Sequence, residues 1–412
     1  MSAPLRAGYK QTEMGVIPED WVLISAVDAC SKIQDGTHFS PRVSGNDYFY
    51  VTSKNIRFGY LDMSTASRID AVQHHAIYRR CDVKLGDILL TKDGANTGNA
   101  ALNTLTEEFS LLSSVAFLRF QQSRHCGAYF LQQILVTQGQ RQIQEAMAGN
   151  AITRLTLQKI NKLRFPVPPT KGEQEAIAEA LSDADALIES QEQFVAKKRH
   201  LKQGAMQDLL NGKKRLPGFS GEWEVKRLGD IARVFSGGTP PTAVTSYYGG
   251  DIPWITSGDL NKSTIWDVEG RITAHGLENS SAKMIAENTL LIALYGATSG
   301  ITAISRIQAA INQAVLAIIP KADDSVYLFF KLSYLKDWII STYTQGGQPN
   351  LSGDIVKSIE LSLPAVSEQI AIATVLSDMD AEITELEAQL AKARAVKQGM
   401  MHQLLTGKIR LI

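Results

Sequence analysis

The chain has 412 residues, of which 44% are hydrophobic, and its 42 lysines and arginines balance its 42 aspartates and glutamates. It is long enough for two or more domains, and its longest apolar run, residues 289–297, is too short to span a bilayer. The N-terminus lacks the pattern of a secretion signal, and Cys30, Cys81 and Cys126 show no metal-site spacing. We therefore expect a soluble cytoplasmic protein with reduced thiols.

Residues 1–165 predict a mixed α/β domain, here called globular region 1. Short apolar runs bounded by glycine and polar residues predict strands at 48–52, 87–91 and 114–120. Apolar residues at helical spacing predict a helix at 128–147. The region holds 18 basic and 14 acidic residues. That balance is not the strongly basic patch of a protein that grips DNA unaided.

Residues 166–216, here called helical segment 1, predict one long helix. Apolar residues recur at spacings of three and four, as in the a/d seam of a coiled coil, although polar residues interrupt the pattern. Gly212 stands where the helix should end. The seam residues of this segment are Leu181, Ile188, Val195 and Leu209.

Residues 217–362, here called globular region 2, repeat the plan of the first region. Strands are predicted at 252–256, 289–294 and 314–320, and a helix at 325–343. Turn-rich stretches predict surface loops at 236–241, 247–251 and 346–350. With 11 basic and 14 acidic residues, this region too lacks a basic patch.

Residues 363–412, here called helical segment 2, carry a clearer coiled-coil seam. Its members are Leu376, Ile383, Leu386, Leu390, Met400 and Leu404. Laid over each other with a shift of 195, residues 173–216 and 368–411 are identical at 25 of 44 positions. The chain is therefore a tandem repeat of globular region and long helix.

The charges of the two helices predict how they pair. Acidic residues crowd the first half of each helix and basic residues the second half. This distribution complements the helix dipole. Antiparallel pairing would also place the acidic half of one helix beside the basic half of the other. We therefore expect an intramolecular antiparallel coiled coil, with pairing between two chains as the competing arrangement.

The globular regions share short motifs as well. At a shift of 202, Gly36-Thr37 falls on Gly238-Thr239, and the turn 94–98 falls on 296–300. The regions have diverged more than the helices. This difference suggests that the helices perform one shared task while the globular regions recognise different things.

Motifs for catalysis are absent from the sequence. It contains no Gly-x4-Gly-Lys-Ser/Thr loop, no Gly-x-Gly-x-x-Gly fingerprint and no Gly-x-Ser-x-Gly elbow. The Asn/Asp-Pro-Pro-aromatic tetrapeptide of amino-methyltransferases is missing too. We therefore expect no catalytic residue, no bound cofactor and no metal site in this chain.

The ordered double set of motifs resembles the specificity subunit of bacterial type I restriction–modification enzymes. The resemblance covers essentially the whole chain. It rests on an N-terminal motif, two helix entries and two Leu-Leu-x-Gly-Lys helix exits. Their residues are Tyr9-Lys10, Thr12-Glu13, Gly15, Ile17-Pro18, Asp20-Trp21, Pro169 with Glu173-Gln174, Pro364 with Glu368-Gln369, 209–213 and 404–408.

The resemblance implies an α+β protein with two tandem target-recognition domains, each followed by a long helix, the helices pairing as an antiparallel coiled coil with pseudo-two-fold symmetry. It implies a non-catalytic subunit whose globular regions each read one half of an asymmetric bipartite site in double-stranded DNA. The helices would set the spacer and dock two methyltransferase subunits, through which the restriction and translocation subunits join. S-adenosylmethionine, ATP and Mg²⁺ would belong to those partners.

DNA-contacting residues are expected in loops and at strand ends, at matching places in the two regions. In globular region 1 they are Thr37, His38, Thr52, Ser53, Lys54, Asn55, Arg57, Lys92, Asn96 and Thr97. In globular region 2 they are Thr239, Thr256, Ser257, Asn261, Lys262, Tyr295, Thr298, Ser299, Gln348 and Asn350. The helix positions Lys202, Gln203, Lys397 and Gln398 are expected to serve packing or docking.

Three alternatives are weighed against this prediction. An autonomous DNA enzyme conflicts with the missing motifs. A coiled-coil assembly protein whose globular regions bind protein or glycan would explain the helices, but not the divergence of two sibling regions that share Gly-Thr and Thr-Ser elements. The recognition subunit of a fused methyltransferase–nuclease system would look very similar in sequence, and neighbouring genes would distinguish it.

Overall fold

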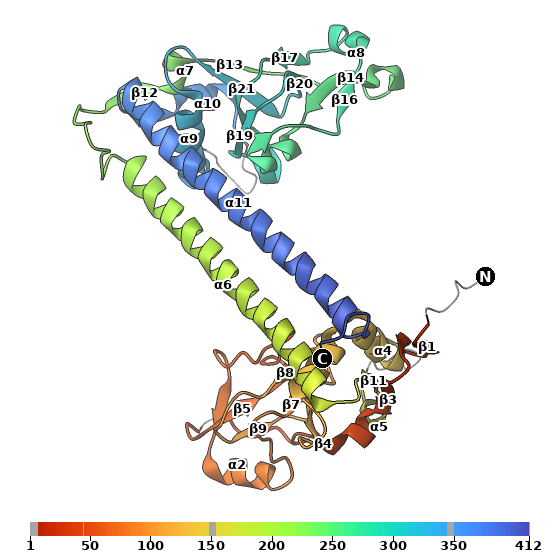
Figure 1. Ribbon diagram of the computed structural model, residues 1–412. Helices are drawn as coiled ribbons and strands as arrows, with labels where there is room; N and C mark the ends of the chain where they lie inside the picture. The colour runs from red at the N-terminus through yellow and green to blue at the C-terminus, as the bar shows by residue number, and fades with distance from the viewer. Residues whose placement is uncertain (1–6, 44, 148–153, 344–349, 412) are drawn as a thin grey trace. The chain divides into compact units, whose positions relative to one another are not determined.

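The computed structural model describes residues 7–43, 45–147, 154–343 and 350–411 (Figure 1). The chain divides into two compact units. Unit 1 comprises residues 1–192 and 389–412, and unit 2 comprises residues 193–388. Each unit therefore holds one globular region and a part of each long helix. The unit boundaries cut both helices, whereas the predicted segments keep each helix whole.

Unit 1 begins with short strands and small helices and ends in the long helices. In chain order its elements are β1 (Tyr9–Thr12), β2 (Gly15–Pro18), β3 (Val22–Ser25), α1 (Ala26–Ala29), β4 (Cys30–Asp35), β5 (Tyr48–Val51), β6 (Ser67–Ile69), α2 (Ala71–Tyr78), β7 (Ile88–Thr91), β8 (Ala100–Leu102), β9 (Phe109–Leu111), β10 (Val115–Phe120), α3 (Gly127–Leu135), α4 (Thr137–Met147), α5 (Leu157–Asn161) and β11 (Arg164–Val167). The helix α6 (Lys171–Leu209) begins in unit 1, and α11 (Val366–Leu404) ends there.

The core of globular region 1 lies on both faces of the antiparallel sheet β4-β10-β7-β8. Successive residues of a strand point to opposite faces. Accordingly, Ile88 and Leu90 pack with Tyr129 and Phe130 of α3, while Leu89 packs with the small sheet β6-β5-β9. Burial on both faces explains why these strands are continuous apolar runs in the sequence.

Unit 2 repeats this arrangement. Its elements are β12 (Glu224–Arg227), α7 (Leu228–Ile231), β13 (Ala232–Ser236), η1 (Thr245–Tyr247), β14 (Tyr248–Ile255), η2 (Ser257–Lys262), β15 (Thr264–Ile265), β16 (Arg271–Ile272), α8 (Ala274–Glu278), β17 (Lys283–Ile285), β18 (Leu290–Ala293), η3 (Gly296–Thr298), β19 (Thr302–Ser305), β20 (Ala309–Ile311), β21 (Val315–Pro320), α9 (Ser325–Tyr343), α10 (Gly353–Ser358) and β22 (Glu360–Leu363). The sheet β13-β21-β18-β19-β15 packs Leu290 and Ile292 against α9 on one face, and Leu291 with the sheet β16-β14-β20-β17 on the other.

Two local expectations were wrong. The helix expected at 128–147 is two helices, α3 and α4, because the backbone of Val136 is extended between them (φ −64°, ψ 153°). The loop expected at 247–251 lies mostly inside β14, whose pairing with β16 shifts register between Tyr248 and Ile252. Gly249, with φ at +75°, permits this bulge, since a left-handed backbone favours glycine.

The long helices pair antiparallel within each unit, as predicted. In unit 1, Arg394 pairs with Glu192 (2.6 Å) and Lys397 with Asp185. The residue numbers of the paired positions therefore run in opposite directions along α6 and α11. The same two pairs recur in unit 2 at positions shifted by 195. There Arg199 pairs with Glu387 (2.6 Å) and Lys202 with Asp380.

Four of the predicted seam residues, Leu181, Leu209, Leu376 and Leu404, belong to the cores of the globular regions. Of all ten predicted seam residues, seven are buried and three are partly buried. The buried ones are Leu181, Val195, Leu209, Leu376, Ile383, Leu390 and Leu404, and the partly buried ones are Ile188, Leu386 and Met400. None of the described helices combines the length and apolar character that crossing a membrane requires.

Candidate nucleic-acid interface

In globular region 1, the segments that follow β4, β5 and β7 converge on Ser113 and Ser114. The Thr37 amide donates to Leu111 O (2.8 Å), and the Ser113 amide donates to Thr37 O (2.8 Å). The Lys92 amide donates to Ser114 O (2.9 Å), and the Ser53 amide donates to Ser114 Oγ (3.3 Å). We call these segments (36–38, 52–57, 92–98, 113–114 and 154–156) loop cluster 1. It brings together three stretches of predicted DNA contacts that lie far apart in sequence.

Globular region 2 builds an equivalent loop cluster 2 from residues 237–239, 256–262, 294–300, 312–314 and 350–352. The Gly238 amide donates to Ile311 O (3.1 Å), and the Asn312 amide donates to Ile255 O (3.1 Å). The Leu294 amide donates to Ala314 O (2.8 Å). Two globular regions with diverged sequences thus hold their loops with matching backbone hydrogen bonds.

The structure corrects one sequence match by a single residue. A Cβ on Gly36 would lie 2.1 Å from Leu111 O, and one on Gly237 would lie 1.8 Å from Ile311 O. Both positions therefore require glycine, so that Gly36 corresponds to Gly237 and not to Gly238. It follows that the counterpart of Thr239 is His38. Thr37 corresponds to Gly238, which has no side chain to offer DNA.

The second shared motif was matched in the correct register. The Gly98 amide donates to Thr91 O and the Gly300 amide to Ala293 O, both at 2.9 Å. Both glycines have positive φ, 98° and 77°. The hydroxyls of this turn bond to its own backbone carbonyls. They belong to Thr97 (2.7 Å to Gly94 O), Thr298 (3.1 Å to Tyr295 O) and Ser299 (3.1 Å to Leu294 O).

Several other predicted contacts also hold the loops in shape. Asn55 accepts from the Thr52 amide (3.0 Å) and donates to Asp62 O (3.1 Å), and its side chain is buried. Asp259 accepts from both the amide and the hydroxyl of Thr256 (2.9 Å each), which is the same cap in region 2. These polar groups are already used by the protein, so they position the loops for their exposed neighbours.

Exposure divides the twenty predicted DNA contacts into four groups. The buried residues are Thr37, Asn55, Lys92 and Ser299. The partly buried residues are Thr52, Ser53, Arg57, Asn96, Thr97, Thr239, Thr256, Ser257 and Thr298. The exposed residues are His38, Lys54, Asn261, Lys262, Tyr295 and Asn350. Gln348 lies outside the described residues.

A charge network occupies the centre of loop cluster 1. The ammonium of Lys92, whose side chain is only 3% exposed, lies 3.3 Å from Asp35 and 3.2 Å from Asp93. Asp93 also pairs with Arg154 (2.8 Å), and Asp35 lies 3.4 Å from the His38 ring. Lys92 is therefore committed to the protein's own carboxylates, while Arg154 and His38 carry the network to the surface.

Sequence reasoning missed Arg154. The signal was present, because Leu155 and Leu351 both precede a long helix and Asn350 was selected in region 2. The Leu155 amide donates to Lys92 O (3.0 Å) and the Leu351 amide to Leu294 O (2.8 Å), so Arg154 and Asn350 are structural counterparts. By the same hydrogen bonds, Leu294 is the structural counterpart of Lys92, and Tyr295 is the counterpart of Asp93. At these three positions loop cluster 2 has neutral residues, whereas loop cluster 1 has Lys92, Asp93 and Arg154.

The repeated Glu-Gln and Arg-Leu motifs join each globular region to the helices. Arg410 forms a bidentate pair with Glu173 (2.5 and 2.8 Å), and Arg215 forms the same pair with Glu368 (2.5 Å for both bonds). Gln174 accepts from the Cys126 amide at the start of α3 (3.0 Å). In unit 2, Gln369 accepts from the Asp324 amide just before α9 (3.0 Å). These contacts are structural, which explains why the motifs occur twice.

One residue of each joint differs between the units. Gln133 Nε2 donates to Leu405 O (3.0 Å), whereas in unit 2 the Lys331 ammonium donates to Leu210 O (2.5 Å). Both side chains are buried. Burial lowers the pKa of Lys331 to about 8, because an ammonium away from water disfavours its charged form.

In globular region 1, His74 and Cys81 are both buried. The His74 ring is buried, stacks on Tyr48 (3.7 Å between ring centroids) and lies 3.0 Å from Ser110 Oγ. Burial lowers the pKa of His74 and raises the pKa of Cys81 to about 12. Across residues 7–43, 45–147, 154–343 and 350–411, no three potential metal ligands gather into a cluster.

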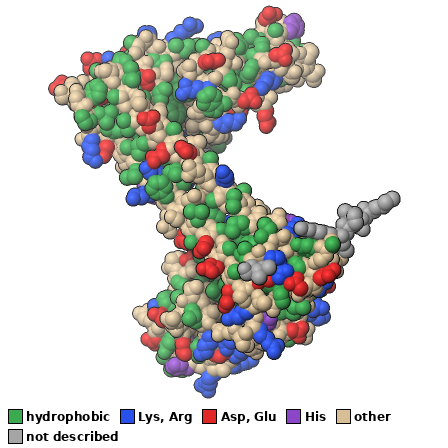
Figure 2. Space-filling view, in the orientation of Figure 1, with side chains coloured by type: hydrophobic (Ala, Val, Ile, Leu, Met, Phe, Trp, Pro, Cys, Tyr) green, Lys and Arg blue, Asp and Glu red, His purple; other side chains and the backbone are tan. Residues whose placement is uncertain are grey.

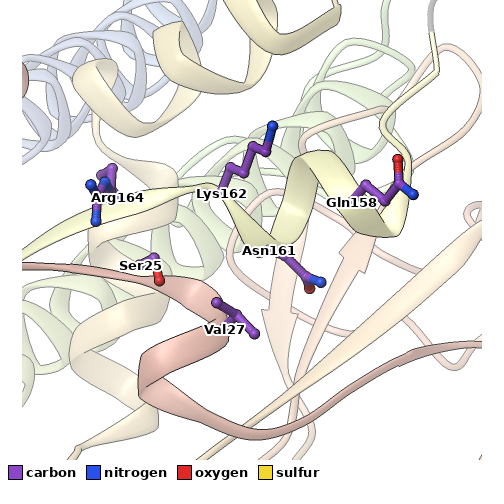
Figure 3. Close-up of a pocket in the computed structure, with 6 residues that line it drawn as sticks. All are labelled: Ser25, Val27, Gln158, Asn161, Lys162 and Arg164. Atoms are coloured by element: carbon purple, nitrogen blue, oxygen red, sulfur yellow. The ribbon is translucent and has the colours of Figure 1, made fainter.

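A surface depression in unit 1 shares no lining residue with loop cluster 1. It is lined by Ser25, Val27, Gln158, Asn161, Lys162 and Arg164 (Figure 3). Ser25 bonds to Asp28 and Arg164 pairs with Glu13 (3.1 Å). None of the twenty predicted DNA contacts lines it. In Figure 2, basic and acidic side chains are interspersed on the visible face of both globular regions, in keeping with the balanced charge of the sequence.

Comparison with known proteins gives one consistent result. A family model described as the type I restriction modification DNA specificity domain matches residues 60–197 and 220–393. The putative type I restriction enzyme MjaX specificity subunit of Methanocaldococcus jannaschii is 25% identical over 424 residues, covering 98% of this chain and 97% of that protein. The MjaIX specificity subunit of the same organism is 34% identical over 165 residues, covering 39% and 38% of the two chains.

Solved structures agree at the level of fold. The type I restriction–modification S subunit from M. genitalium superposes with a TM-score of 0.60 at 15% identity, covering 93% of this chain and 96% of that one. A chain from a type I R-M system, described for complex assembly and conformational transition, gives a TM-score of 0.56 at 16% identity, covering 95% and 99%. These likenesses extend over both globular regions and both long helices.

Proposed function

This chain belongs to the type I restriction modification DNA specificity family, and from that membership we propose that it is the DNA-recognition subunit of a type I restriction–modification complex. Each globular region reads one half of a bipartite site in double-stranded DNA. The alternative of an assembly protein that binds protein or glycan gains no support from the relatives, which are specificity subunits.

The observation that carries this proposal is the pair of loop clusters. Both are held by matching backbone hydrogen bonds, such as those from the Lys92 amide to Ser114 O and from the Leu294 amide to Ala314 O. Their side chains nevertheless differ, with Asp93 and Arg154 in one cluster and Tyr295 and Asn350 in the other. A shared scaffold that displays different donors and acceptors suits two readers of different base sequences.

The helices supply geometry in this proposal. Each of α6 and α11 has 39 residues, which corresponds to about 58 Å at 1.5 Å per residue. That length exceeds one turn of DNA, about 34 Å, and the helices would set the number of base pairs between the half-sites. The ion pairs that recur in the two units support two equivalent docking sites, one for each of two methyltransferase subunits.

Chemistry belongs to the partner subunits. The sequence lacks the Asn/Asp-Pro-Pro-aromatic tetrapeptide and any phosphate-binding loop. We therefore assign S-adenosylmethionine to the methyltransferase subunits, and ATP and Mg²⁺ to the restriction and translocation subunits that join through them. Methyl transfer to a base in a duplex requires that the base be flipped out of the stack, and this chain would select which base is presented.

Methylation mapping tests the proposal. The gene is expressed with its methyltransferase partner in a host without other modification systems, and modified adenines are mapped against a strain carrying the partner alone. We expect one asymmetric motif of two short halves separated by unspecified bases. Absence of any new motif, when both proteins are expressed and copurify, would contradict the proposal.

A further inference from the structure

Arg154 occupies a defined backbone position at the edge of loop cluster 1. The amide of the next residue, Leu155, donates to Lys92 O (3.0 Å), and α5 begins two residues later at Leu157. The chain on the C-terminal side of Arg154 is therefore tied to the end of β7. The side chain of Arg154 is 46% exposed.

The guanidinium of Arg154 is held by an ion pair with Asp93. Its Nε lies 2.8 Å from Asp93 Oδ1, and Asp93 Oδ2 lies 3.2 Å from the buried Lys92 ammonium. Lys92 is fixed in turn by Asp35 at 3.3 Å. In the described part of the chain, Asp93 is the only carboxylate paired with Arg154. In this ion pair Asp93 lies nearest to Nε, so the two terminal nitrogens, which carry four of the five guanidinium hydrogens, remain for an outside acceptor.

This arrangement has a specific chemical complement. A guanidinium that offers two parallel N–H donors matches O6 and N7 of guanine in the major groove, whereas Asn and Gln match adenine. We propose that Arg154 reads a guanine in the half-site of globular region 1, and that Asp93 is its positioning residue. The proposal rests on the proposed function, since it names the base that one loop cluster selects.

Globular region 2 has different residues at these two positions. Asn350 stands in the place of Arg154, with its Oδ1 at 3.5 Å from the Gly296 amide, and Tyr295 stands in the place of Asp93. Both members of the ion pair are replaced together in globular region 2, which indicates that Asp93 and Arg154 act as a pair. A preference for guanine through this position is therefore confined to one half-site.

The alternative role for Arg154 is a phosphate contact. Arginines on phosphates strengthen binding to all sequences and carry no base information. A carboxylate held against the guanidinium reduces its net charge, which weakens that role. Orientation of the guanidinium by Asp93 matters at a base edge, because recognition there depends on the alignment of two N–H donors with two acceptors.

The test compares methylation motifs and DNA binding of the complex of this chain with its methyltransferase. The variants are Arg154→Asn, Arg154→Lys and Asp93→Asn, and Arg141→Asn is the matched control because Arg141 is an exposed, ion-paired arginine on α4. Binding is measured with duplexes that carry each base in turn at every position of the motif. Thermal unfolding confirms that each variant is folded.

We expect Arg154→Asn to lower the preference for guanine at one position of one half-site by roughly 10- to 100-fold, with the other half-site and the spacer unchanged. Arg154→Lys keeps the charge but loses the planar fork, so it should lose selectivity while retaining more affinity. Asp93→Asn should show a smaller loss at the same position.

Two results would overturn the inference. An unchanged motif in Arg154→Asn would show that the residue reads no base. A uniform loss of affinity for every duplex, with the motif intact, would identify a phosphate contact. Wild-type complex without any bipartite motif would overturn the proposed function as well, so the two failures are distinguishable.

Discussion

Globular regions 1 and 2 hold their loop clusters with matching backbone hydrogen bonds but place different side chains on them. Region 1 buries Lys92 between two carboxylates and extends the network to Arg154. Region 2 places Leu294, Tyr295 and Asn350 at the corresponding positions. By contrast, both joints to the helices keep one ion pair, Arg410 with Glu173 in unit 1 and Arg215 with Glu368 in unit 2, although Gln133 of the first joint is replaced by Lys331 in the second. The two units therefore differ in the charged network of their loops but share the arginine–glutamate pair of their joints.

The largest expected effect comes from breaking the network of region 1. Lys92→Leu introduces the residue of region 2 but leaves Asp35 buried without its cation, which should lower the free energy of unfolding by about 3–5 kcal/mol. The double variant Lys92→Leu, Asp35→Ser copies both residues of region 2, because Ser236 is the counterpart of Asp35. It should recover most of the loss.

Urea unfolding of the full chain, followed by far-UV circular dichroism, measures both variants. A double variant as unstable as the single one would show that the two charges are not coupled. In that case the network would not explain the difference between the regions.

A smaller, pH-dependent effect is expected at the joint. Lys331 is buried with a pKa of about 8 instead of 10.5. The folded state thus gives up the proton at lower pH than the unfolded chain. The cost of burying the charge is present in full below pH 8 and disappears as the pH rises from 8 to 10.5.

Lys331→Gln copies Gln133 of unit 1 and removes this cost. At about 1.4 kcal/mol per pH unit, the gain in stability near pH 7 is at most about 3–4 kcal/mol, and it should vanish near pH 10.5. Lys321→Gln is the control, because Lys321 is exposed. A pH-independent difference between Lys331→Gln and wild type would show that the charge of Lys331 does not limit stability.

The smallest effect distinguishes two matched tyrosines. Tyr129 donates to Pro166 O (2.7 Å), whereas the buried hydroxyl of Tyr327 has no hydrogen-bond partner among the described residues. Tyr129→Phe should cost about 1–2 kcal/mol, and Tyr327→Phe should be neutral or slightly stabilising. Thermal unfolding of the two variants under one buffer checks the difference, and equal losses would contradict it.

Much of the fold could be predicted from the sequence because its signals are periodic. The seam from Leu376 to Leu404 and the opposed charges indicated antiparallel helices, and the ion pairs within each unit confirm them. Apolar runs such as 87–91 indicated strands because both faces of the sheet are buried. The break at Val136 was missed, although Val136, Thr137 and Gly139 are all residues of low helix propensity, because the apolar spacing continues across it.

The candidate site was harder to predict because polar residues in loops have two uses. Asn55 and Ser299 have hydrogen-bonding side chains of the type that contact bases, yet both are buried and bonded to their own loops. Lys92 was expected to contact DNA, but its ammonium is paired with Asp35 and Asp93 of the protein itself. Only three-dimensional pairing shows that the exposed members of this network are Arg154 and His38.

The measurement that tests the central claim most directly is a domain exchange. Residues 1–165 are replaced by those of a relative with a different motif, and the methylation motif of the chimeric complex is mapped. If the two loop clusters are independent readers on one scaffold, only one half-site should change, while the other half-site and the spacer length remain. A chimera that assembles and alters both half-sites would contradict the account.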